Sequence, residues 1–180
     1  MKNRNALLFC WFCLGMLCLI NLVYAGPLAE EAVVRGKDYY SQGKYEQAIK
    51  EFSDAIDSDS KNLEAYYGRG QVYQASNKFD KAIEDYSKAL EGDQKNAEVY
   101  YNRGVVYYYK DLIEEAIADW SKAIELCPTC PESYLKRAYA YFKKEDYDKS
   151  WSDVHSLDEL NHLPPAKFLQ DLKGQSGRDK

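Results

Sequence analysis

The stretch AEVYYNRGVVYYYKDLIEEAIADWSKAIELCPTC, residues 97–130, returns in altered form on both sides of itself. Its centre is an Arg, a small residue, and an aromatic ring four residues after the Arg, and this group recurs every 34 residues. The four copies are Arg35, Gly36 and Tyr39; Arg69, Gly70 and Tyr73; Arg103, Gly104 and Tyr107; and Arg137, Ala138 and Tyr141. A fixed period of this length predicts an array of repeated units rather than one compact domain around a catalytic cleft.

The second half of each unit keeps the same step. Its registers are Ala48, Ala82, Ala116 and Ser150; Phe52, Tyr86, Trp120 and Val154; and Ala55, Ala89, Ala123 and Leu157. This pattern predicts two amphipathic helices of roughly 12–14 residues in each unit. Turn residues within the units are Gly43, Asn77, Asp111 and Glu145, and those between units are Asp59-Ser60, Asp93-Gln94 and Cys127-Pro128. The small residues let the two helices of a unit approach closely.

These registers resemble the tetratricopeptide repeat (TPR) family, and residues 97–130 fit its motif nearly throughout. The matching residues there are Tyr100, Gly104, Tyr107, Ala116, Trp120, Ala123 and Pro128. The resemblance implies an all-α, right-handed α-solenoid of four helix pairs within residues 26–163, with units at about 29–62, 63–96, 97–130 and 131–164. It also implies a scaffold or adaptor that binds a protein or peptide segment and is not an enzyme.

A short helix with Phe168, Leu169 and Leu172 on one face is expected within residues 164–173. A repeat array needs such a terminal helix to cover its last apolar surface. The polar residues 174–180 are expected to form a flexible tail.

The arginines depart from the family, which usually has Leu at this position. An acid follows each one sixteen residues later, in the pairs Arg35/Glu51, Arg69/Asp85, Arg103/Asp119 and Arg137/Asp153. A partly buried Arg is tolerated when it is paired, so these eight residues are interpreted as structural ion pairs. The alternative is a ladder of free guanidinium groups that grips an anionic ligand.

The family's ligand surface is the concave face lined by the first helices of the units. By the resemblance, the partner-binding groove comprises Tyr67, Gln71, Tyr101, Val105, Tyr108, Tyr109, Tyr139 and Phe142, with Glu64, Glu98 and Glu132 at the rim. The aromatic part of this set predicts an interaction site, and the acidic rim favours a peptide that carries Lys or Arg beside apolar anchors. The alternative is that the C-terminal helix covers part of the groove.

Family members that hold the acidic C-terminus of heat-shock chaperones use five Lys, Asn and Arg positions. The matching residues here are Val33, Lys37, Gly68, Glu98 and Asn102, and four of the five do not fit. The sequence therefore argues against that ligand.

The formal net charge is −5, and it becomes 22 − 29 = −7 without Lys2 and Arg4. A nucleic-acid partner would need a basic face, so none is expected. The chain shows no Ser/His/Asp set, phosphate-binding loop or cluster of metal ligands, and it has only two His. No enzymatic activity, cofactor or metal is expected.

Residues 1–25 have the layout of a secretory signal peptide: two cations, an apolar run from Ala6 to Ile20, and Val23-Tyr24-Ala25 before Gly26. Cleavage there would place the repeats outside the cytoplasm, in the periplasm or secreted. The alternative is an uncleaved membrane anchor, since Ala6 to Val23 is just long enough to cross a bilayer.

Cys127 and Cys130 are the two cysteines that remain after such a cleavage. A structural disulfide is the expected state outside the cytoplasm. Haem attachment would require His directly after the second Cys, where Pro131 stands, and a zinc site would require two further ligands. A thiol-redox protein that uses this pair is the alternative function, because Cys130 precedes an expected helix start.

Overall fold

The computed structural model describes residues 28–177, and every regular element in that range is an α-helix. A first helix covers residues 28–41. It is followed by α2 (Tyr45–Ser58), α3 (Leu63–Ala75), α4 (Phe79–Gly92), α5 (Ala97–Tyr109), α6 (Ile113–Leu126), α7 (Pro131–Lys143), α8 (Tyr147–Glu159) and α9 (Ala166–Ser176). These are the predicted helix pairs, and the all-α solenoid class is confirmed.

The chain divides into two compact units, Met1–Val72 and Tyr73–Lys180. The predicted leader, residues 1–25, lies outside the described residues. Within residues 28–177, no helix is both long enough and apolar enough to span a bilayer.

The first unit packs around the ring of Phe52 on α2. A Cβ atom added to Gly36 would lie 2.9 Å from this ring, and one added to Gly68 on α3 would lie 2.5 Å from it. Phe52 itself is 1% exposed, within a core of small and branched residues. Two glycines from different helices therefore make room for one aromatic side chain.

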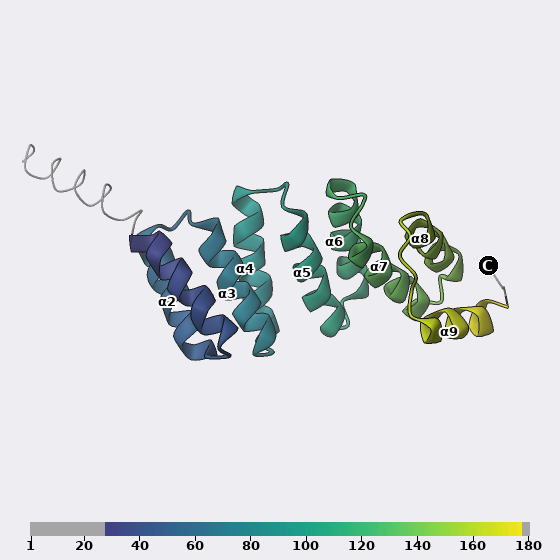
Figure 1. Cartoon of the computed structure of the whole chain (residues 1–180), viewed down its shortest axis with the longest axis horizontal. Helices are drawn as coiled ribbons and strands as arrows, with labels where there is room; N and C mark the ends of the chain where they lie inside the picture. The colour runs from purple at the N-terminus through teal and green to yellow at the C-terminus, as the bar shows by residue number, and fades with distance from the viewer. Residues whose placement is uncertain (1–27, 178–180) are drawn as a thin grey trace, which may run out of the picture. The chain divides into compact units, whose positions relative to one another are not determined.

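In the second unit, consecutive helices from α4 to α9 lie side by side in chain order (Figure 1). Here Trp120 of α6 takes the place that Phe52 has in the first unit. A Cβ atom on Gly104 would lie 2.8 Å from its Nε1 atom. In the fourth pair the register positions of Gly104 and Trp120 hold Ala138 and Val154, and both are buried in one core cluster. Where Ala replaces Gly on the first helix, a smaller side chain thus replaces the aromatic ring on the second.

The turns within the units use left-handed backbone conformations. Asn77, Asp111 and Glu145 have φ values of 57°, 64° and 60°, and Gly43 has 71°. L-residues rarely adopt such angles, so these positions end one helix and redirect the chain into the next. The predicted turn positions are confirmed.

The terminal helix α9 covers the end of the array. Phe168 and Leu172 are buried against Trp151 and Val154 of α8. The helix ends at Ser176, three residues beyond the predicted end at Lys173, so residues 174–176 are not part of a flexible tail. Gly177 stops it with a φ of 68°, and Ser176 Oγ accepts a hydrogen bond from Trp151 Nε1 at 3.0 Å.

Gly104→Ala should lower the free energy of unfolding by about 1–3 kcal/mol, because its Cβ would overpack the contact with Trp120. The control is Gly174→Ala on α9, where nothing lies within 4 Å of the added Cβ. That change should raise stability by about 0.5–1 kcal/mol through helix propensity. Chemical denaturation of both variants measures the difference, and a neutral Gly104→Ala would contradict the close approach of α5 and α6.

Candidate functional site

Arg103, in the third repeat, bridges two neighbouring repeats. Arg103 donates from Nε and Nη2 to the two carboxylate oxygens of Asp119, both at 2.8 Å. Its Nη1 donates to Ser87 Oγ of the preceding repeat at 3.0 Å. The rings of Tyr100 and Tyr107 each lie 5.7 Å from its Cζ atom, within cation–π range.

The fourth repeat has the same arrangement. Arg137 donates to both oxygens of Asp153, at 2.9 Å and 2.7 Å, and to Ser121 Oγ at 2.9 Å. The Tyr134 and Tyr141 rings lie 5.9 Å from its Cζ atom. Burial is the main cause that raises the pKa of Asp153 above its ordinary value, and the Arg137 hydrogen bonds oppose it. Retaining the charge of this carboxylate therefore depends on the arginine.

The first of the two compact units, which ends at Val72, holds two variants of the arrangement. Arg35 pairs with Glu51 at 2.8 Å and with Glu31 at 2.9 Å, and its side chain is more exposed than those of the later arginines. Arg69 donates to Ser53 Oγ at 2.9 Å. Asp85 is buried on α4, which belongs to the second unit.

The serines that complete the bridges were not singled out by the sequence reasoning. Ser53, Ser87 and Ser121 recur at the 34-residue step, and each hydroxyl donates to the carbonyl four residues earlier while it accepts from the arginine. The period was the signal that could have found them. With a carboxylate, a hydroxyl and two rings around each of Arg103 and Arg137, these guanidinium groups have a structural role. The geometry does not favour the anion-gripping alternative.

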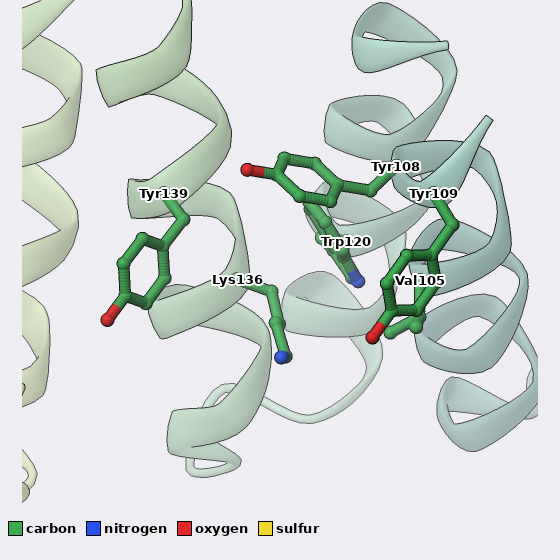
Figure 2. A pocket seen from close by; sticks show the side chains of 6 residues that line it. All are labelled: Val105, Tyr108, Tyr109, Trp120, Lys136 and Tyr139. Atoms are coloured by element: carbon green, nitrogen blue, oxygen red, sulfur yellow. The ribbon is translucent and has the colours of Figure 1, made fainter. Parts of the chain in front are cut away.

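A pocket opens in the second unit between α5 and α7. It has a volume of about 180 Å³ and is lined by Val105, Tyr108, Tyr109, Trp120, Lys136 and Tyr139. Figure 2 shows Lys136 extending from α7 into the space between the two helices, with Tyr108 and Tyr109 opposite on α5. We call this set the aromatic pocket. Four of its residues were predicted groove residues.

The floor and one wall of the aromatic pocket were missed by the sequence reasoning. Trp120 had been assigned only to packing, but although it is 1% exposed it lines the pocket, with its ring against Gly104. Lys136 lies one turn before Tyr139 on α7, so helical spacing from Tyr139 was the signal available for it. A buried ring and a lysine stem thus complete the predicted aromatic surface.

Neighbouring rings and charges hold the mouth of the aromatic pocket in place. Tyr109 is 66% exposed, and its ring stacks on Phe79 of α4 at 5.8 Å. The Tyr108 ring centre lies 5.8 Å from that of Trp120. Lys143 Nζ lies 5.2 Å from the centre of the Tyr108 ring. Lys143 is held in turn by Asp111 at 2.5 Å. An exposed ring that is fixed in this way is a preorganised contact surface.

The other predicted groove residues lie elsewhere. Phe142 packs against Phe168 of α9 and Tyr147 of α8, at 5.7 Å and 5.9 Å, and is not among the residues that line the aromatic pocket. Tyr101 is half-buried against the cluster around Trp120. In the first unit, Gln71 Nε2 donates to the hydroxyl of Tyr67 at 2.9 Å. Helix α9 therefore covers part of the predicted surface, as the alternative expectation held.

The charge around the aromatic pocket is mixed. Lys136 is the one charged residue in its lining. Glu98 and Glu132 are exposed in the first turns of α5 and α7. In the first unit, Glu64 forms an ion pair with Lys37. Burial raises the pKa values of Tyr101 and Tyr139, so both hydroxyls remain neutral near pH 7.

Cys127 and Cys130 form a disulfide across the turn between α6 and α7. Within residues 28–177, no group of three or more His, Cys, Asp or Glu side chains is arranged to hold a metal ion.

The helix pairs and the 34-residue registers define a protein of the repeat-scaffold class. The TPR repeat family model matches residues 36–77 and 75–111, and the tetratricopeptide repeat model matches residues 97–130. This chain belongs to the tetratricopeptide repeat family. No match was found among curated proteins.

Several solved structures share this fold. The crystal structure of MamA is 25% identical over 78% of this chain and 82% of that one, with a TM-score of 0.72. The first TPR of Spaghetti (RPAP3), bound to the HSP90 peptide SRMEEVD, is 25% identical over 67% and 95%, with a TM-score of 0.65. YrrB, a TPR protein with an unusual peptide-binding site, is 21% identical over 81% and 75%, with a TM-score of 0.72.

The ion pair between Arg103 and Asp119 can be tested with a double-mutant cycle. Arg103→Met and Asp119→Asn should each lower the free energy of unfolding by about 3–5 kcal/mol, because each leaves a buried partner unsatisfied. The double variant should lose much less than the sum of the two. The exposed pair Lys122/Glu125 is the control, and Lys122→Met should cost less than about 1 kcal/mol. Additive losses at Arg103 and Asp119 would exclude the pairing.

Proposed function

We propose that this chain is a non-enzymatic adaptor that binds a protein or peptide segment in the aromatic pocket. The observation that carries the proposal is the combination of an open cavity of about 180 Å³ with the fixed, 66% exposed ring of Tyr109 at its mouth. Aromatic side chains in such positions dominate binding energies at many interfaces. The peptide bound to RPAP3 and the peptide-binding site of YrrB support the same class of function.

The size and lining of the aromatic pocket suit one apolar or aromatic side chain of the partner. Lys136 at the wall favours a carboxylate directly beside this anchor. Glu98 and Glu132 favour Lys or Arg further along the segment, as the sequence predicts.

The HSP90 peptide bound by RPAP3 is not proposed as the ligand. Of the residues at the positions used by chaperone-binding members, Val33 is only 3% exposed and Lys37 is paired with Glu64. At Gly68, the Phe52 ring occupies the space where a side chain would begin. Val33 and Gly68 therefore present no polar side chain to an acidic peptide, and Lys37 would have to exchange its partner Glu64 for one.

Binding can be measured with N-acetyl-phenylalanine, an aromatic side chain beside a carboxylate, in an NMR titration. Tyr109→Ala and Tyr108→Ala should each weaken binding at least about tenfold, as expected when an aromatic anchor is truncated. Lys136→Glu should weaken binding of the acid but not of N-acetyl-phenylalanine amide. The control is Leu163→Ala, which truncates a 77% exposed apolar side chain outside the pocket and should have no effect.

Equal affinity of wild-type chain and Tyr109→Ala for both probes would exclude the aromatic pocket as the binding site. Phe142→Ala is unsuitable for this purpose, because Phe142 supports α9 and its loss would also lower stability.

We also propose that the repeats act outside the cytoplasm after removal of residues 1–25. The proposal rests on the layout of that segment and on the disulfide, which persists in oxidising compartments. N-terminal sequencing of the chain purified from its native cell should begin at Gly26. A chain that keeps Met1 and fractionates with cytoplasmic proteins would contradict this.

A further inference from the structure

The turn between α6 and α7 differs chemically from the equivalent turns between the earlier repeats. In those turns Asp59 and Asp93 accept hydrogen bonds from the backbone N–H two residues later, at 3.0 Å and 2.9 Å. Asn62 and Asn96 accept from the N–H three residues later, at 2.9 Å and 3.2 Å, and so cap α3 and α5. One and two repeat lengths on, the same two positions are Cys127 and Cys130.

The disulfide replaces both side-chain caps with one covalent link. Cys127 is the C-cap residue of α6, and Cys130 is the N-cap residue of α7, where its side chain makes no capping hydrogen bond. The backbone bond from Cys130 N–H to Cys127 C=O, at 3.2 Å, is equivalent to that from Asn62 to Asp59. The start of α7 therefore depends on the sulfur bridge where α3 and α5 depend on an asparagine.

This link is within reach of a reductant. Pro128 and Thr129 are exposed, and both cysteines are half-buried at the turn. Once reduced, Cys130 would lie at the N-terminus of α7, where free backbone N–H groups and the helix dipole stabilise a thiolate. Cys127, at the C-terminal end of α6, lacks that stabilisation. The two sulfurs are thus unequal leaving groups.

The turn also joins two helices that line the aromatic pocket. Trp120 stands on α6, and Lys136 and Tyr139 stand on α7. The hydroxyl of Tyr134 on α7 donates to the carbonyl of Pro128 in the turn at 3.2 Å. A change at the first turn of α7 is therefore one helical turn away from Lys136.

We propose that Cys127 and Cys130 form a thiol–disulfide exchange site for a dithiol, and that their redox state sets the affinity of the aromatic pocket. A thiolate of the dithiol attacks Cys127 Sγ, and Cys130 leaves as the thiolate and takes up a proton. The second thiolate of the dithiol then displaces Cys127 from the mixed disulfide, and Cys127 is protonated. The dithiol is oxidised to its disulfide, and both cysteines are reduced by two electrons in total. The second half of this proposal rests on the proposed function of the pocket.

The test uses the full chain with dithiothreitol as the dithiol. Alkylation and mass spectrometry should show reduction of the pair in the folded state. Amide hydrogen exchange of Leu135, Lys136 and Arg137 should then rise at least tenfold, and the indole N–H signal of Trp120 should shift. The affinity for N-acetyl-phenylalanine should fall at least threefold.

The matched control is the double variant Cys127→Asp with Cys130→Asn, which restores the side chains found in the earlier turns. It should keep the exchange rates and the affinity of the oxidised wild type, and dithiothreitol should change neither. A disulfide that resists dithiothreitol in the folded chain, or the same dithiothreitol response in this variant, overturns the proposal.

The readouts separate the two proposals. Reduction that changes amide exchange and the Trp120 signal, in a chain that binds N-acetyl-phenylalanine in neither state, supports the exchange site and overturns its coupling to the pocket. Binding that is unchanged by reduction, together with unchanged exchange, overturns the switch and leaves the pocket proposal standing.

Discussion

The contact between a glycine and an aromatic ring determines how closely the helices around Phe52 and Trp120 approach. Phe52 occupies the space that side chains on Gly36 and Gly68 would fill, and Trp120 does the same opposite Gly104. Glycine lowers helix stability by about 1 kcal/mol relative to alanine, so its presence within these helices reflects a steric requirement. Burial of the large rings offsets that cost. In the fourth pair the equivalent positions hold the larger Ala138 and the smaller Val154, and both are buried in one core cluster.

The arginine bridges depend on this spacing. Arg103 reaches a carboxylate sixteen residues ahead and a serine hydroxyl sixteen residues behind, so one side chain joins the second helices of two consecutive repeats. A hydrophobic residue at that position would bury area without fixing a register. The planar guanidinium group, with its donors in fixed directions and two tyrosine rings each 5.7 Å away, specifies where the neighbouring helix lies.

The aromatic pocket is a further consequence of the same packing. Because Gly104 has no side chain, Trp120 comes close to α5 and lines the aromatic pocket together with Val105, Tyr108 and Tyr109 of that helix. At the C-terminal end of the second unit, Phe168 of α9 packs against Phe142 and Tyr139 of the last repeat. The ring centres of Tyr139 and Phe168 lie 4.1 Å apart. The capping helix thus limits the length of the exposed aromatic surface.

The sequence by itself determined the helix pairs, their turns and the residues that face each other within a repeat. The same residue pattern recurs four times at a 34-residue period, so each copy supports the same assignment. Helical spacing then predicts that the groove residues lie on one face of each first helix. It did not show which of those residues remain open to a partner. Phe142 is covered by α9, whereas Trp120 and Lys136 line the aromatic pocket, because the contacts of a residue depend on the neighbouring helices and not only on the face that it occupies. The serine bridges and the replacement of two polar caps by a disulfide were present in the registers. Only the tertiary structure showed that those side chains meet, because contacts between repeats depend on how one helix pair rests on the next.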